Sequence, residues 1–116
     1  MKTDYENMWD FDVVVTSDMP DINRVHPMVQ SSADALYRAF VKDANIRLFA
    51  IFGSAVDIAC SLRSDLDVYI ETADTDKRVE LPYDELKVEI DLLRDLRHDS
   101  FLYERIATTA LVVFER

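Results

Sequence analysis

The stretch RLFAIFGS, residues 47–54, decides the fold of this chain. Its first six residues form a nearly continuous apolar run, which is typical of a strand that is buried on both faces. The run ends at Gly53, the only glycine among the 116 residues. A glycine in this position favours a tight turn or the close approach of another group, because it carries no side chain. We therefore predict a buried strand over residues 47–52 and a turn at its end whose geometry requires glycine.

Two further strands are predicted downstream, over residues 66–71 (LDVYIE) and 87–93 (KVEIDLL), because apolar and polar residues alternate in both. Successive side chains of a strand point to opposite faces, so Asp65 and Asp67 share one face of the first of these strands. If both strands bury their aliphatic faces against the same helices, Asp91 projects from that side of the sheet too. Three neighbouring carboxylates repel one another, which raises their pKa values, and a divalent cation with a preference for oxygen ligands relieves the repulsion. The pattern predicts a site for magnesium or manganese.

Helices are expected on both sides of these strands in the sequence. Apolar residues recur at helical spacing over residues 28–44, and Pro27 suits the first turn of that helix. Asp99 or Ser100 is a candidate cap for a second helix that runs to about Thr108, and residues 110–114 (ALVVF) form a last strand. We predict an α+β fold: a small mixed, mostly antiparallel sheet with helices packed on one face and the acidic residues on the open face.

The chain is long enough for one domain with a single core. We assign residues 28–116 to that domain and residues 1–27 to an N-terminal extension with a candidate short strand over 11–16 (FDVVVT). The first residues are acidic, unlike a signal peptide, and no apolar run approaches the roughly 20 residues that span a bilayer. Cys60 is the only cysteine, which excludes an intrachain disulfide and makes a cytoplasmic location the expectation. The formal net charge of −10 argues against direct binding of nucleic acid.

The arrangement of these motifs resembles the minimal nucleotidyltransferases of the DNA polymerase beta superfamily. The resemblance rests on the pair Gly53-Ser54, the ten residues that follow it, the pair Asp65 and Asp67, and Asp91 on the next strand. It covers roughly residues 30–116. It implies that the Gly-Ser pair contacts the triphosphate of a nucleotide and that Asp65 and Asp67 bind magnesium. It also implies that Asp91 completes a second metal position or activates the acceptor hydroxyl.

The loop between the two motifs departs from the pattern of this family. Members usually carry Arg-Gly where this chain has Asp57-Ile58, and a negative side chain near a triphosphate is unfavourable unless it points away. Arg63 is a candidate for the missing positive charge and hence for contact with the nucleotide. Because Asp57 disfavours catalysis, a degenerate nucleotidyltransferase fold that neutralises a partner by binding alone stays open as an alternative.

The length of the chain bears on which molecule is expected to accept the nucleotide. Stand-alone minimal nucleotidyltransferases are similar to the antitoxins that pair with HEPN-domain toxins. That resemblance implies transfer of AMP from ATP, with two Mg²⁺ ions, to a tyrosine of the toxin within a complex, and the strong acidity suits a basic, RNA-cleaving partner. Transfer to a small molecule such as an aminoglycoside is an alternative, which would require a homodimer to complete the pocket because no second domain is present.

Several other chemistry-bearing residues have simpler interpretations. His26 and His98 share no metal-ligand spacing with each other or with Cys60, so we expect them at the surface or at helix ends. Tyr69 is a candidate for stacking on a nucleobase, although packing within the protein is the more common role of a strand aromatic. Glu89 lies on the acidic face and is expected to point into solvent.

Overall fold

A computed structural model describes residues 17–56 and 65–116 of this chain. The predicted strand at 11–16 and the loop residues Asp57, Ile58, Cys60 and Arg63 lie outside the described residues. The helices and strands are, in order, α1 (Gln30–Val41), β1 (Ile46–Phe52), β2 (Leu66–Thr72), β3 (Ile90–Arg94), α2 (Phe101–Thr109) and β4 (Leu111–Glu115). The described residues also form four short 3₁₀ turns: η1 (Ile22–Arg24) and η2 (Pro27–Val29) precede α1, η3 (Gly53–Val56) follows β1, and η4 (Tyr83–Glu85) lies between β2 and β3.

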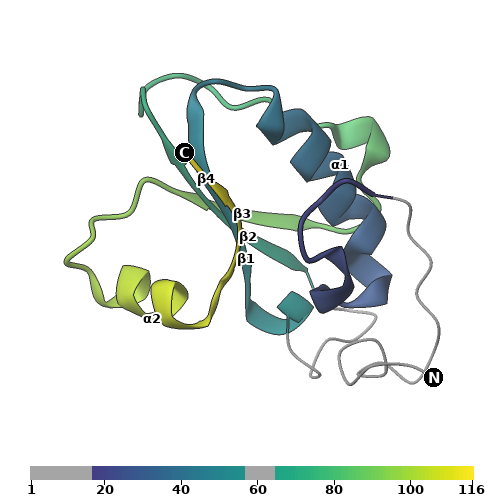
Figure 1. Cartoon of the computed structure of the whole chain (residues 1–116). Helices are drawn as coiled ribbons and strands as arrows, with labels where there is room; N and C mark the ends of the chain where they lie inside the picture. The colour runs from purple at the N-terminus through teal and green to yellow at the C-terminus, as the bar shows by residue number, and fades with distance from the viewer. Residues whose placement is uncertain (1–16, 57–64) are drawn as a thin grey trace.

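The four strands form one mixed sheet in the order β3-β2-β1-β4 (Figure 1). The central strand β1 is antiparallel to β2 and to β4, whereas β3 is parallel to β2. Only the parallel pair needs a long crossover, because its two strands start at the same end of the sheet. The predicted α+β class and the mostly antiparallel sheet are confirmed.

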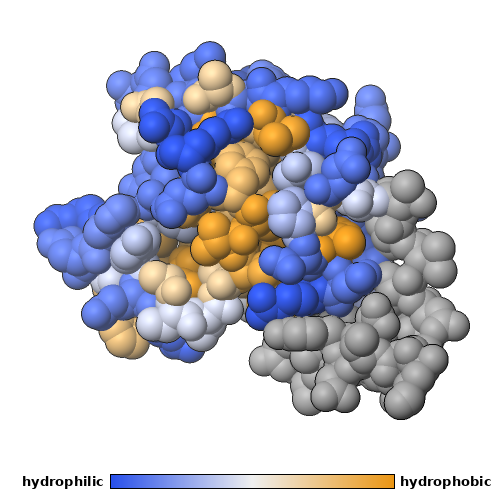
Figure 2. Space-filling model, in the orientation of Figure 1, coloured by the Kyte–Doolittle hydropathy of each residue, from blue (hydrophilic) through white to orange (hydrophobic). Residues whose placement is uncertain are grey.

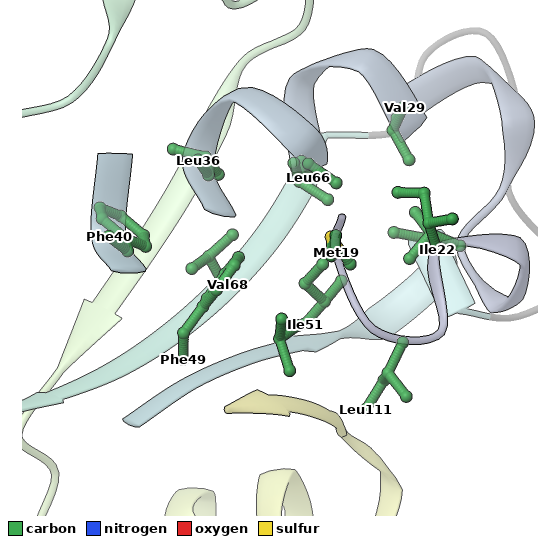
Figure 3. Packing of buried hydrophobic residues seen from close by; sticks show 14 of the residues in the cluster. Met19, Ile22, Val29, Leu36, Phe40, Phe49, Ile51, Leu66, Val68 and Leu111 are labelled. Carbon is green, nitrogen blue, oxygen red and sulfur yellow. The ribbon is translucent and has the colours of Figure 1, made fainter. Parts of the chain in front are cut away.

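Helix α1 covers one face of the sheet and forms the core with it (Figure 3). Leu36 and Phe40 from α1 are fully buried against Phe49 of β1 and Val68 of β2. The Phe40 and Phe49 rings meet edge to face at 5.0 Å between centroids, which is a favoured aromatic geometry. The same cluster takes in Met19, Ile22, Val25, Val29, Ile51, Leu66, Ile70 and Leu111. The last part of the predicted N-terminal extension therefore packs into the core of the domain.

The C-terminal end of α1 is held by Arg116. Its guanidinium donates hydrogen bonds to the backbone carbonyls of Phe40, Val41, Asp43 and Ile46, at 2.7 to 3.1 Å. The last carbonyls of a helix lack partners within the helix, so a guanidinium with several donors satisfies them well. This contact ties the end of the sheet to the end of α1.

Helix α2 lies beside the other face of the sheet (Figure 1), which differs from the expectation that the helices share one face. Tyr69 of β2 points away from the core cluster, and its ring contacts Tyr103 of α2 with 6.1 Å between centroids. Ser100 begins α2 as a cap, since its side chain accepts a hydrogen bond from the backbone N–H of Tyr103. The acidic face is thus partly covered by α2 and open elsewhere.

Two element boundaries differ from the predictions for local reasons. β3 begins at Ile90 and not at residue 87, because the backbone N–H of Lys87 donates to the Ser32 hydroxyl of α1 and leaves the sheet. α1 spans a shorter range than 28–44 because its start is a 3₁₀ turn, η2, with Pro27 at the first position. His26 caps this turn, which confirms the expectation of a surface or helix-end position, and its side chain is buried.

The surface combines charged flanks with exposed apolar side chains. Figure 2 shows hydrophobic surface across the centre of one face, bordered by hydrophilic residues. The large apolar residues with substantial exposure are Met28, Val41, Tyr83, Phe101, Leu102 and Val112. Contiguous apolar surface of this kind is typical of an interaction site.

Within residues 17–56 and 65–116, no helix combines the length and the apolar character needed to cross a membrane.

Candidate functional site

The turn at Gly53 packs directly against the carboxylate of Asp67. Gly53 has φ 72°, a left-handed conformation that side-chain-bearing residues adopt rarely. A β-carbon at this position would lie 3.2 Å from Cγ of Asp67 and would overlap its Oδ2. The glycine is therefore required twice, for its backbone angle and for its close contact with a carboxylate. The two sequence motifs, which are separated by a loop, meet at this point.

Asp67 and Asp91 are direct neighbours across the parallel pair of strands β2 and β3. Residues paired in this way project from the same side of a sheet, so the predicted common face of the two side chains is confirmed. Asp65 directly precedes β2 and contributes to the same charge cluster. Burial, followed by the negative charges of Asp91 and Asp65, raises the pKa of the Asp67 carboxyl above its usual value.

The donor chemistry of this cluster fits a hard cation, since three carboxylates offer only oxygen ligands. The side chains are not drawn together around one point: among the residues that the structure describes, no three His, Cys, Asp or Glu side chains are grouped closely enough to hold a metal ion. Asp65, Asp67 and Asp91 are therefore neighbours that repel one another, and a cation would have to pull them inward. The assignment of Mg²⁺ to these residues stays a prediction.

The residues that are predicted to contact the nucleotide lie only partly within the described part of the chain. Ser54 follows Gly53 within η3, which is a four-residue 3₁₀ turn. The backbone N–H of His26 donates to the carbonyl of Ala55 at 2.7 Å and fixes this turn against the start of η2. Arg63, the predicted source of positive charge, lies outside the described residues.

A polar cluster adjoins the carboxylates on the same face of the sheet. Glu71 accepts hydrogen bonds from the hydroxyl of Tyr69, at 2.6 Å, and from Nε2 of His98. The His98 ring stacks on Tyr103 of α2, with 4.2 Å between centroids and 9° between planes. Tyr69 is buried, and burial and the Glu71 carboxylate raise the pKa of its phenol. Tyr69 therefore packs within the protein and does not offer a free face for a nucleobase.

The sequence did not point to the residues of α2 that face the end of β1. Leu102, Arg105, Ile106 and Thr109 are spaced three and four apart and form one stripe of the helix. That spacing was visible in the sequence, but it does not tell which face of the sheet a helix covers. Only the contact between α2 and the acidic face brings Arg105 near Gly53.

Three placements therefore define the candidate site: Gly53 lies in a left-handed conformation against Asp67, Asp67 pairs with Asp91 across the two strands, and α2 lies beside Gly53. Glu89, which precedes β3, is exposed to solvent, as expected. When this chain is compared with protein-family models, with curated proteins and with solved structures, no match is found.

Proposed function

We propose that this chain is a metal-dependent nucleotidyltransferase that transfers AMP from ATP to a hydroxyl group of a protein partner. The observation that carries the proposal is the contact between Gly53 and Asp67. Because Gly53 has no side chain, the backbone of this turn lies directly against a carboxylate, and Asp91 extends the acidic surface on the next strand. A glycine turn beside oxygen ligands suits chemistry on a nucleoside triphosphate.

In the proposed reaction, an acceptor hydroxyl oxygen attacks the α-phosphorus of ATP. A new P–O bond forms, the bond between the α-phosphorus and its bridging oxygen breaks, and pyrophosphate leaves with that electron pair. Asp91 takes the hydroxyl proton, a contribution of about 10²–10⁴-fold for a well-placed base. Asp65 and Asp67 would hold Mg²⁺, which supplies charge stabilisation at the attacking and leaving oxygens when it is bound. Burial and the charges of Asp91 and Asp65 raise the pKa of Asp67, and a cation beside this carboxylate would stabilise its ionised form.

A protein acceptor is supported by the surface of the molecule. The hydrophobic surface across the centre of one face (Figure 2) is the kind of patch that binds another protein. The net charge of −10 favours a basic partner, such as the HEPN-domain toxin that the family resemblance implies. The complex would present a partner hydroxyl to the acidic face.

A second candidate is binding without catalysis. It is favoured by Asp57 in the loop and by the separation of the acidic side chains, which form no assembled metal site among the described residues. In that case the chain would neutralise its partner by covering it, with no need for ATP.

The deciding experiment follows radioactive label from α-phosphate-labelled ATP, with Mg²⁺, to the protein encoded beside this one. Asp67→Asn removes the charge of the central carboxylate, and Asp84→Asn makes the same change at an exposed residue of η4, away from the site. We expect label on the partner with the unmodified chain and with Asp84→Asn, and none with Asp67→Asn. Equal labelling by all three would overturn the metal role. A stable complex without label from any of the four nucleotides would establish the binding-only alternative.

A further inference from the structure

A hollow of about 190 Å³ lies between the end of β1 and helix α2. Its walls come from two segments that are about fifty positions apart in the sequence. The lining residues are Phe52, Gly53, Leu102, Arg105, Ile106 and Thr109. Most of this lining is apolar, with one positive charge.

The hollow and the carboxylate cluster share a wall. Phe52 is paired in register with Asp67 across β1 and β2, so the two side chains project from the same face of the sheet. Gly53 lines the hollow and also contacts the Asp67 carboxylate. Gly53 therefore links the hollow to the acidic residues within the part of the chain that the structure describes.

Arg105 supplies positive charge at this point. Its side chain is exposed, and its guanidinium lies 5.9 Å from the centre of the Phe101 ring. Within the described part of the chain, none of the ion pairs involves Arg105. In a protein with a net charge of −10, an arginine without a carboxylate partner is available to an anionic ligand. A guanidinium suits phosphate oxygens because it can donate two parallel hydrogen bonds to them.

We propose that this hollow holds the nucleoside of the triphosphate and that Arg105 binds its phosphates. This inference rests on the proposed nucleotidyltransferase function and assigns a nucleotide subsite to it. Sites for whole drug-sized ligands measure about 300–1,000 Å³, so a hollow of about 190 Å³ accommodates only part of a nucleotide. The base packs against Phe52, Leu102 and Ile106, and the phosphates pass Arg105 and Gly53 toward Asp67. Arg105 on α2 then provides the positive charge that the loop lacks, because Asp57 stands where the resembled family usually carries arginine.

The first test measures the affinity of the chain for ATP and for tripolyphosphate by calorimetry, both in the presence of Mg²⁺. Arg105→Ala is compared with Arg97→Ala, which removes an exposed arginine that pairs with Asp99 outside the hollow. We expect Arg105→Ala to weaken both ligands by about 10-fold or more, as for the loss of a charged hydrogen bond. Arg97→Ala should leave both affinities within about twofold, and Arg105→Lys should recover part of the loss.

The second test separates the base from the phosphates. Leu102→Gln makes a half-exposed wall of the hollow polar, and Val112→Gln makes the same kind of change at an exposed position of β4. We expect Leu102→Gln to weaken ATP several-fold and to leave tripolyphosphate unchanged, because tripolyphosphate has no base. Val112→Gln should alter neither affinity. Thermal unfolding of each variant checks that the fold is retained.

The outcomes distinguish the two proposals. If the unmodified chain binds ATP and labels its partner while Arg105→Ala and Leu102→Gln bind ATP as tightly as it does, the subsite is wrong and the proposed function survives. If the unmodified chain neither binds ATP nor transfers label, both proposals are wrong. Loss of ATP affinity in the two hollow variants, with retention in Arg97→Ala and Val112→Gln, supports the subsite.

Discussion

The two faces of the sheet have different chemistry. The α1 face is apolar and closed, with side chains such as Phe49, Ile51 and Val68 completely buried. The opposite face carries Asp67 and its acidic neighbours, one of which, Asp91, is exposed. Burial of apolar surface stabilises the α1 face, whereas like charges destabilise the acidic face. If the proposed function is correct, stability and function are separated across one sheet, since β1 and β2 contribute to both faces.

The largest loss of stability is expected from a substitution on the α1 face. Phe49→Ala removes a fully buried ring that contacts Phe40 and Phe114 edge to face. We expect it to lower the free energy of unfolding by about 3–5 kcal/mol, a large part of the 5–15 kcal/mol typical of a domain. Urea unfolding followed by circular dichroism measures the change. Val112→Ala, at an exposed position of β4, is the control and should change it by less than about 0.5 kcal/mol. Similar values for both variants would mean that the core is not where the structure places it.

A smaller loss of stability is expected from a substitution at Gly53, which follows β1 and contacts Asp67 of the acidic face. Gly53→Ala forces a side-chain-bearing residue into a left-handed conformation and drives its β-carbon into Asp67. We expect a loss of roughly 1–3 kcal/mol in unfolding free energy and a loss of ATP affinity. The double variant Gly53→Ala with Asp67→Ala relieves the overlap but not the backbone strain, so it should recover part of the stability beyond additivity. Strictly additive effects would show that the contact with Asp67 is unimportant.

The sequence predicted the local features of this fold better than the contacts between distant elements. The strand at residues 47–52, the alternation of β2 and the cap at Ser100 are written in a few neighbouring residues, and the structure has all three. The common face of Asp67 and Asp91 could also be predicted, because alternation determines the face of a side chain once the core face is known.

What the sequence could not predict depends on long-range contacts. The late start of β3 follows from the hydrogen bond between Lys87 and Ser32, which are 55 positions apart. The packing of α2 on the acidic face depends on the contact between Tyr69 and Tyr103, and the burial of His26 depends on how the N-terminal turns fold onto the sheet. The hollow beside Gly53 arises from such a contact, so no sequence motif predicts it.

A third prediction uses a carboxylate that supports the fold. Asp95, which has φ 52°, accepts hydrogen bonds from the backbone N–H and hydroxyl of Thr72 and from Arg94. Burial alone would raise its pKa, but these hydrogen bonds outweigh burial and lower the pKa below 3.8. Asp95→Asn keeps a residue that tolerates this backbone angle and removes the charge. We expect a loss of about 1 kcal/mol in unfolding free energy at neutral pH.

The pH dependence of this loss tests its cause. A carboxyl whose pKa is lowered by folding contributes stability above its unfolded value, and the contribution is lost as the pH falls through its folded value. The difference between the unmodified chain and Asp95→Asn should therefore shrink below about pH 3.8. A difference that is independent of pH would assign the loss to altered packing around Thr72.

The smallest expected change in the free energy of unfolding is a gain, and it comes from the substitution Asp67→Asn. Folding raises the pKa of this carboxyl through burial and the charges of Asp91 and Asp65, so its ionised form destabilises the folded chain. That penalty is absent below the ordinary value of 3.8 and is complete once the pH exceeds the raised folded value. Asp67→Asn should therefore unfold at a slightly higher urea concentration than the unmodified chain at pH 7, with a difference that vanishes in acid, although the proposed function requires that it transfer no AMP.

Magnesium should reverse the order of these two proteins. A cation that binds the folded acidic site stabilises the unmodified chain in proportion to the logarithm of its concentration, and Asp67→Asn lacks the carboxylate that we propose as its central ligand. Unfolding in urea at pH 7, with and without Mg²⁺, measures both effects on the same samples. If Asp67→Asn is less stable than the unmodified chain without Mg²⁺, the carboxylate supports the fold as Asp95 does. A gain in stability without the cation, together with a loss of the response to it, identifies a residue that is kept for binding at the expense of the fold.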